Sequence, residues 1–215
     1  MSEFEYQIDF PDPRGADAEG LVAVGGDFSV PYLLAAYRNG IFPWSFDPVS
    51  WWSPDPRGIM ELDQFYVSRT LRKVLKKELF EIRINTAFRS VMEACATTRK
   101  NGNWITREFI DAYEIFHQQG HAHCVECWQE GQLAGAVYGV AVGGVFAGES
   151  MFHRVNDASK VALYHLVQHL KERRFSFLDV QLITPTTEAL GAIEIQREDY
   201  LQRLTDARSM KVTFI

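Results

Sequence analysis

The spacing of hydrophobic and polar positions changes along the chain, and the changes predict a mixture of strands and helices. Short apolar or alternating runs between turn residues indicate strands at 80–84, 122–129, 133–142, 145–152, 175–181 and 194–195. Apolar residues three to four positions apart, preceded by capping residues, indicate helices that open near Ser29, Ser68, Thr86, Thr106, Asp157 (or Asn156) and Pro185, and a last helix around Tyr200. Three consecutive antiparallel strands therefore precede a long helix and a further strand.

The first part of the chain shows no such spacing. Residues 1–30 are rich in turn-forming residues, and residues 41–57 form an aromatic, proline-rich run with Trp44, Trp51 and Trp52. One interpretation of this run is a loop whose aromatic side chains fill a small core, and another is the wall of a binding cleft; both can hold. We therefore expect a small N-terminal domain at 1–57 and a larger domain at 58–215, in an α+β fold with a mixed, mostly antiparallel sheet flanked by helices.

Three polar side chains interrupt strands that are otherwise apolar. Glu149 lies between Phe146 and Phe152, and Asp179 and Gln181 follow an apolar run. Burying such groups costs free energy unless they are bonded or used. Because residues two apart on a strand point to the same face, we expect Asp179 and Gln181 side by side, with Glu149 as a third partner from another strand.

Composition narrows the class of protein. The 215 residues are 47% hydrophobic and 23% charged, an ordinary globular mixture with enough apolar residues for a sizeable core. No apolar run reaches the length of a membrane span, about 18 residues, and the N-terminus does not read as a signal peptide. Three cysteines are too few for a disulfide framework, so we expect a cytoplasmic protein without membrane contact. The absence of a heptad repeat favours a monomer.

The net charge of −6 hides an uneven distribution. Between Arg69 and Arg107 ten basic side chains accompany three acidic ones, which makes this segment +7 and leaves −13 for the rest. On the helix that Ser68 opens, basic residues recur at helical spacing along one face: Arg69, Arg72, Lys73 and Lys76. Such a stripe is commonly a solvated face, but its density also suits contact with the phosphates of a polyanion.

A Cys-x-x-Cys pair, Cys124 and Cys127, follows two histidines and suggests a zinc site. The surrounding residues read as a strand, on which positions three apart point to opposite faces. No second Cys or His pair follows in the sequence. We therefore expect no metal site here.

The order of elements resembles the acyltransferase fold of the GNAT superfamily, in which strands after a meander splay apart around an acyl donor. Members that use acetyl-CoA carry a glycine-containing loop before the long helix, whereas residues 152–158 contain no glycine, so a CoA site is not expected. More specific motifs resemble the leucyl/phenylalanyl-tRNA–protein transferase family over nearly the whole chain. They are Gly25-Gly26-Asp27, Gly40-Ile41-Phe42-Pro43-Trp44, Trp51-Trp52-Ser53-Pro54-Asp55-Pro56-Arg57, Trp104-Ile105-Thr106, Gly120-His121-Ala122-His123, Gly148-Glu149-Ser150-Met151-Phe152, Ala158-Ser159-Lys160, Asp179-x-Gln181 and Leu190-Gly191-Ala192.

This resemblance implies an enzyme with a small N-terminal domain and a GNAT-like catalytic domain. Such an enzyme moves Leu or Phe, and Met less well, from aminoacyl-tRNA to the α-amino group of proteins that begin with Arg or Lys. The product carries an N-degron, a terminal residue that marks it for degradation. No metal or diffusible cofactor is implied.

The resemblance also implies roles for individual residues. Asp179 and Gln181 would be catalytic, with Gln181 touching the attacking amine and Asp179 polarising or orienting it, while the ribose hydroxyl of the tRNA is a further candidate for relaying the proton. The pocket for the donor side chain would comprise Phe146, Glu149, Leu163, Leu166 and Leu170. The 3′ adenosine would lie on Trp44 and Trp104, as fits stacking of a base on aromatic rings, and the acceptor stem on Arg69, Lys73, Lys76 and Lys77.

Alternative interpretations remain at this stage. Asp179 could instead cap the helix that follows Pro185, and Glu149 could form a structural ion pair with Arg154 or Lys160. The chain could also be a CoA- or carrier-dependent N-acyltransferase of the GNAT type, or a non-catalytic module that binds tRNA or N-degrons.

The chain departs from the family in one motif. Thr186 and Ala189 stand where the family usually has His and Ser. Any role that the histidine has in the family is therefore in doubt for this chain, and so is the preference for the acceptor.

Overall fold

A computed structural model describes residues 8–98 and 104–215, which form two sheets. The small sheet has the order β1 (Leu21–Val24), β3 (Val49–Trp52), β2 (Phe42–Phe46). The large sheet has the order β10 (Ile193–Ile195), β4 (Arg57–Glu61), β9 (Phe177–Gln181), β8 (Val145–His153), β7 (Gln132–Val142), β6 (Ala122–Gln129), β5 (Glu81–Ile84). Only β8 and β9 pair in parallel, so the predicted α+β class with a mixed, mostly antiparallel sheet is confirmed.

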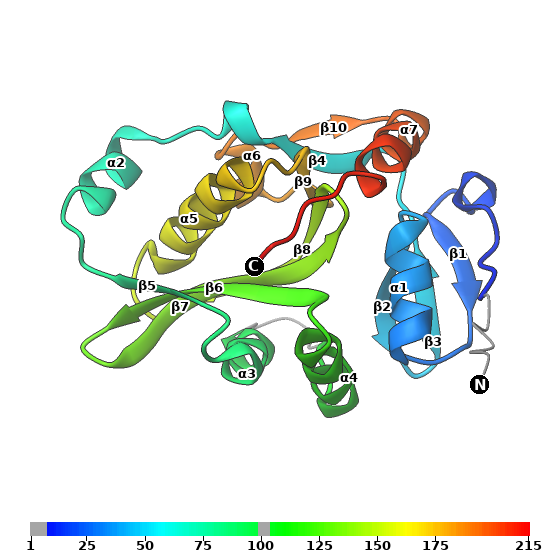
Figure 1. Ribbon diagram of the computed structural model, residues 1–215, viewed down its shortest axis with the longest axis horizontal. Helices are drawn as coiled ribbons and strands as arrows, with labels where there is room; N and C mark the ends of the chain where they lie inside the picture. The colour runs from blue at the N-terminus through cyan, green and yellow to red at the C-terminus, as the bar shows by residue number, and fades with distance from the viewer. Residues whose placement is uncertain (1–7, 99–103) are drawn as a thin grey trace.

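Helices cover both faces of the large sheet (Figure 1). The helices of the described residues are α1 (Val30–Arg38), α2 (Arg69–Leu75), α3 (Phe88–Thr98), α4 (Arg107–Gln118), α5 (Ala158–Glu172), α6 (Pro185–Glu188) and α7 (Arg197–Arg208). Of these, α3 and α4 pack on one face of the large sheet and α5 on the other, whereas α1 lies beside the small sheet and α2 packs on α5. Two short 3₁₀ turns, Pro13–Gly15 and Leu62–Gln64, complete the elements. Side chains of α1, α3 and α4 share one apolar cluster, and those of α2 and α5 share another on the opposite side of β6, β7 and β8.

Local chemistry explains most of these elements. The side-chain oxygens of Ser68 and Thr106 accept hydrogen bonds from backbone N–H groups in the first turns of α2 and α4, as predicted. Asp157 precedes α5 as predicted, but its side chain makes no capping hydrogen bond and contacts Lys160 instead. Glu130 and Gly131 both have positive φ angles, which suits the tight turn between β6 and β7.

The loop interpretation of residues 41–57 is wrong, because this run contains β2, β3 and the start of β4. Its prolines and tryptophans conceal the alternation that marks strands elsewhere. The pairing of β2 with β3 also contains an irregularity between Pro43 and Ser45, so the pattern is broken within the strand itself. Trp51 is 1% exposed, while Trp44 is 40% exposed, so both the core role and an open aromatic surface are present in this run.

The two cysteines of the Cys-x-x-Cys pair lie on opposite faces of β6, as predicted. Cys124 belongs to the cluster under α3 and α4, and Cys127 to the cluster under α5. Within the ranges that the structure describes, no three His, Cys, Asp or Glu side chains are grouped to hold a metal ion. In the same ranges, no helix is long and apolar enough to cross a membrane.

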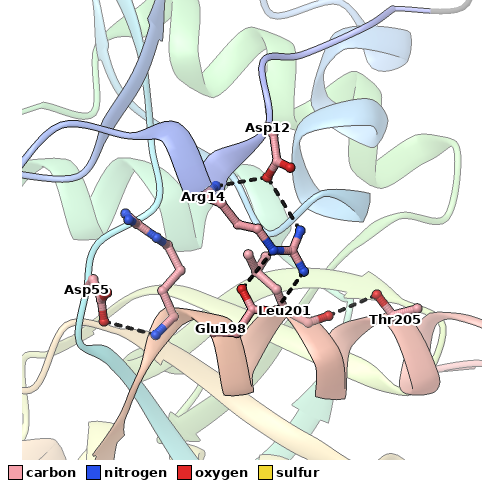
Figure 2. Close-up of polar contacts among 7 residues, drawn as sticks. Asp12, Arg14, Asp55, Glu198, Leu201 and Thr205 are labelled. Carbon is pink, nitrogen blue, oxygen red and sulfur yellow. Dashed lines mark hydrogen bonds and ion pairs between the residues drawn. The ribbon is translucent and has the colours of Figure 1, made fainter.

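Contacts with α7 connect the N-terminal segment and the small sheet to the large sheet. Figure 2 shows Arg14 reaching Glu198 on α7, with nitrogen–oxygen distances of 2.7 and 3.0 Å. Asp55 Oδ1 accepts a 2.9 Å hydrogen bond from the backbone N–H of Arg197, at the start of α7. The predicted domain boundary at residue 57 falls where the chain leaves the small sheet and enters β4.

Candidate active site

The parallel pair β8–β9 provides the site with its geometry. Its ladder runs from Val145–Phe177 to Ala147–Asp179. Further along, Glu149 is the extra residue of a bulge against β7, because Gly148 pairs with Gly139 and Ser150 with Tyr138. There the strands are bridged by side chains, since Gln181 Nε2 donates to Glu149 Oε1 at 2.6 Å. The bulge and the left-handed backbone of Gln181 (φ 62°) aim these two groups at each other across the strands.

Asp179 is fully buried and accepts four hydrogen bonds. Arg57 donates through Nε to Oδ1 at 2.9 Å and through Nη2 to Oδ2 at 2.7 Å. The Tyr200 hydroxyl reaches Oδ2 at 2.8 Å, and the backbone N–H of Gln181 reaches Oδ1 at 2.9 Å. Since these donors occupy both oxygens, the carboxylate orients its neighbours and has no oxygen free of a partner with which to take a proton.

Little in the sequence pointed to Arg57 and Tyr200 as residues of the site. Arg57 is 2% exposed, donates to the carbonyl oxygen of Gly40 at 3.0 Å, and its guanidinium carbon lies 4.2 Å from the centre of the Tyr200 ring. Burial opposes the charged form of Arg57, but the neighbouring Asp179 and Tyr200 raise its pKa above the usual value, so the guanidinium stays protonated. The available signal was a cation directly before the apolar run Gly58-Ile59-Met60.

Glu149 sits in a different environment from Asp179. It is 8% exposed, and burial raises the pKa of its carboxyl to about 7, although hydrogen bonds from Tyr37 and Gln181 partly oppose the rise. The Tyr37 hydroxyl lies 2.5 Å from that of Tyr113, so a line of polar groups runs from α4 through α1 to Glu149 and Gln181. A carboxyl with a pKa near 7 exchanges protons readily at neutral pH.

Both structural alternatives for the carboxylates are wrong. The residue that caps α6 is Thr184, whose side chain forms a capping box with Thr187, and Asp179 takes no part in it. The side chain of Lys160 contacts Asp157 at 2.9 Å, and Arg154 donates to the carbonyl oxygen of Leu133. Glu149 is bonded to an amide and a phenol and has no ion pair with either base.

The residues expected to form the donor pocket fall into two groups. Four of them lie in one apolar cluster beneath α5 and are at most 3% exposed: Phe146, Leu163, Leu166 and Leu170. Glu149 instead contacts Tyr37, which belongs to the cluster on the other face. The alternation of a strand explains this separation, because Glu149 lies three positions after Phe146 on β8 and therefore points to the opposite face of the sheet.

The remaining predicted residues are partly or fully exposed. The Trp44 ring is partly exposed on β2 and lies 5.5 Å from the ring of Trp52. Trp104 is half-buried and packs edge-on against Phe109 at 4.9 Å. On and just after α2, Leu71 packs inward and the predicted basic residues are exposed: Arg69, Lys73, Lys76 and Lys77. Two basic residues of the same segment, Arg99 and Lys100, lie outside the described residues.

Comparison with known proteins gives consistent matches. The family model described as leucyl/phenylalanyl-tRNA protein transferase matches residues 59–205, and that of its N-terminal domain matches 26–55. A leucyl/phenylalanyl-tRNA–protein transferase of Shewanella sp. (strain W3-18-1) is 50% identical over 98% of this chain and 90% of its own. The one of Sulfurimonas denitrificans is 49% identical over 93% of this chain and 89% of its own.

Solved structures resemble the chain more distantly. A ribosomal-protein-alanine N-acetyltransferase from Brucella melitensis covers 51% of this chain and 84% of its own, with 16% identity and a TM-score of 0.36. A likeness of this size carries no functional argument.

Proposed function

The chain belongs to the leucyl/phenylalanyl-tRNA–protein transferase family, and we propose that it moves Leu or Phe, and Met less well, to proteins that begin with Arg or Lys. Its activity as an aminoacyl-tRNA-dependent acyltransferase follows from about half of its residues being identical to such enzymes over almost its full length. The new N-terminal residue would act as an N-degron. A charged-tRNA donor places the reaction in the cytoplasm, and action as a monomer stays a prediction.

The reaction is the aminolysis of an ester. The acceptor's α-amino nitrogen forms a bond to the donor's carbonyl carbon, and the bond from that carbon to the ribose oxygen breaks. One amine proton must leave before or during attack, and a proton must reach the ribose oxygen as it departs. The protein must therefore hold a neutral amine against the ester and supply a group that exchanges protons near neutral pH.

The observation that carries the proposal is the pair Gln181–Glu149, which bridges β8 and β9 where their ladder has ended. Gln181 holds the amine, and Glu149, with a pKa of about 7, receives its proton. Asp179 acts as a positioning residue, because its bond to the backbone N–H of Gln181 fixes the strand end from which that amide projects. Glu149 then returns the proton, directly or relayed by the neighbouring ribose hydroxyl, to the ribose oxygen that departs as the ester bond breaks.

The apolar residues beneath α5 would receive the donor side chain. Phe146, Leu163, Leu166 and Leu170 offer only apolar contacts, which reject polar amino acids by desolvation and separate aliphatic ones modestly. They are closed to solvent in this structure, so a donor would displace part of their packing. Trp44 and Trp104 would stack the 3′ adenosine.

The exposed basic residues of α2 make a measurable prediction about tRNA. Reversing Lys73 and Lys76 to Glu should weaken charged-tRNA binding. It should also make the dependence of log affinity on log salt less steep by about 1–2, since each lost phosphate contact reduces the steepness by about 0.7–0.9. The matched control is reversal of Arg173 and Arg174, exposed at the C-terminal end of α5, which changes the net charge equally. Equal slopes in both double variants would refute the α2 contact.

A transfer assay tests the function as a whole. Radiolabelled Leu-, Phe- and Met-tRNA should each label peptides beginning with Arg or Lys, with Met the slowest, and should not label a peptide beginning with Ala. Equal labelling of the Ala peptide would refute the proposed acceptor preference. Transfer that depends on added CoA would favour the alternative N-acyltransferase, and binding of tRNA without any transfer would favour the non-catalytic module.

A further inference from the structure

The last residues of the chain cross from one face of the large sheet to the other. α7 packs beside β4, β8 and β9 in a cluster with Ile59, Val145 and Phe177. The end of α7 lies against the β7–β8 turn, where the backbone N–H of Gly144 donates to the carbonyl oxygen of Ala207 at 2.8 Å, and the Met210 side chain just after α7 lies next to Gly144. Figure 1 shows this tail running from α7 across the sheet to end beside α5. The segment therefore delivers its side chains to the cluster beneath α5.

Phe214 is the side chain that the tail inserts. It is 2% exposed, although Ile215, the next residue, is 63% exposed. The Phe214 ring stacks on His123 at 4.3 Å and lies 5.2 Å from the Phe146 ring. His169 on α5 donates from Nε2 to the Phe214 carbonyl oxygen at 2.6 Å, which fixes the backbone as well as the ring.

These contacts put Phe214 next to the residues proposed to hold the donor side chain. Phe214 shares one apolar cluster with Phe146, Leu163, Leu166 and Leu170. Phe146 precedes Glu149 by three residues on β8, about 10 Å in an extended strand. Phe214 therefore borders this apolar region through Phe146, and its other ring contacts are with His123, His169 and Phe175 rather than with Glu149 or Gln181.

We propose that Phe214 forms the far wall of the donor pocket and that its ring sets the largest side chain the enzyme transfers. This inference rests on the proposed function and deepens it, because it names the residue that limits donor size. An apolar pocket distinguishes its ligands mainly by volume, and a change of one methylene group alters selectivity by about 10–200-fold. A ring at the far wall therefore affects large donors more than small ones.

The histidine behind Phe214 is neutral under assay conditions. Burial lowers the pKa of His123 to about 4, and Asn85 Nδ2 lies 2.9 Å from its Nδ1. The stack is thus one of an uncharged imidazole on a phenyl ring. The variants below are therefore compared at one neutral pH, at which the His123 imidazole is uncharged.

The experiment measures kcat/KM for tRNA charged with Leu, Phe and 2-naphthylalanine, on an Arg-starting peptide. The ratio for naphthylalanine over Leu is the quantity of interest, because the fraction of folded enzyme cancels in it. Phe214→Ala should raise this ratio by about 10-fold or more, and Phe214→Leu by less. If Phe214→Ala does not fold, Phe214→Leu alone should still raise the ratio above that of the wild type.

A control variant separates this effect from general loosening of the core. Phe88→Leu truncates a buried ring on the opposite face of the sheet, and its ratio should equal that of the wild type. Wild-type transfer of Leu combined with unchanged ratios in the Phe214 variants would overturn this inference alone. Absence of Leu transfer by the wild type would overturn the proposed function and, with it, this inference.

Discussion

Replacing Asp179 with alanine is expected to lower the free energy of unfolding by about 3–5 kcal/mol and to abolish most transfer activity. The physical reason is Arg57, which the substitution leaves buried and charged without its carboxylate. A loss of this size is a large fraction of the total stability of an ordinary domain, about 5–15 kcal/mol. Urea denaturation of the purified variant measures the first effect, and the transfer assay at a temperature where it remains folded measures the second.

A double variant separates the structural effect from the functional one. Arg57→Met with Asp179→Leu removes both charges together, and buried ion pairs replaced by apolar side chains often retain their stability. We expect this variant to recover most of the lost stability but not the activity, because Gln181 still lacks the acceptor for its backbone N–H. Full recovery of transfer would show that Asp179 does not position Gln181.

Replacing Glu149 with glutamine is expected to reduce the transfer rate by about 10²–10⁴-fold, the usual effect of losing a proton acceptor. Glutamine keeps an oxygen that can accept from Gln181 Nε2, so the bridge between β8 and β9 is retained. What the variant loses is a group that can hold a proton at neutral pH. Single-turnover rates with pre-charged tRNA measure this step directly. A near-normal rate would rule out Glu149 as the acceptor.

The pH dependence distinguishes proton transfer from a role in shape. The wild type needs both a deprotonated Glu149, with a pKa of about 7, and a neutral acceptor amine, whose pKa is about 7.7–8.0. Below both values, log kcat/KM should therefore rise with pH at a slope of about two in the wild type and about one in Glu149→Gln. A slope that is the same in both enzymes would contradict the assignment.

Glu149→Gln, which is expected to slow transfer, should at the same time raise the free energy of unfolding at alkaline pH. The folded-state pKa of Glu149 lies above its unfolded value, so the native state binds more protons and loses stability as pH rises from about 4.3 through 7. At pH 8 this amounts to about 4 kcal/mol, because the two pKa values differ by about 2.7 and each pKa unit corresponds to about 1.36 kcal/mol. Glu149→Gln should thus be more stable than the wild type at pH 8 and similar to it at pH 4.

Local sequence patterns predicted the helices and the meander for a physical reason. Helical and strand periodicities record which face of a segment is buried, and that information is contained within about ten consecutive residues. The capping residues Ser68 and Thr106 act within their own first turns, so their roles were visible as well. Strands β1 to β4 were missed; in β2 and β3, proline and aromatic residues conceal the alternation, and β1 and β4 are short strands next to turn-rich segments.

The sequence by itself determined which polar residues interrupt apolar strands and which family the chain resembles, because apolar runs and motifs can both be read from consecutive residues. The tertiary structure alone decided their partners. Arg57 meets Asp179 across 122 positions, and Phe214 meets Phe146 only because the tail rounds the β7–β8 turn. Such contacts, like that of Glu149 with Tyr37 on α1, depend on the path of the whole chain and are contained in no run of consecutive residues.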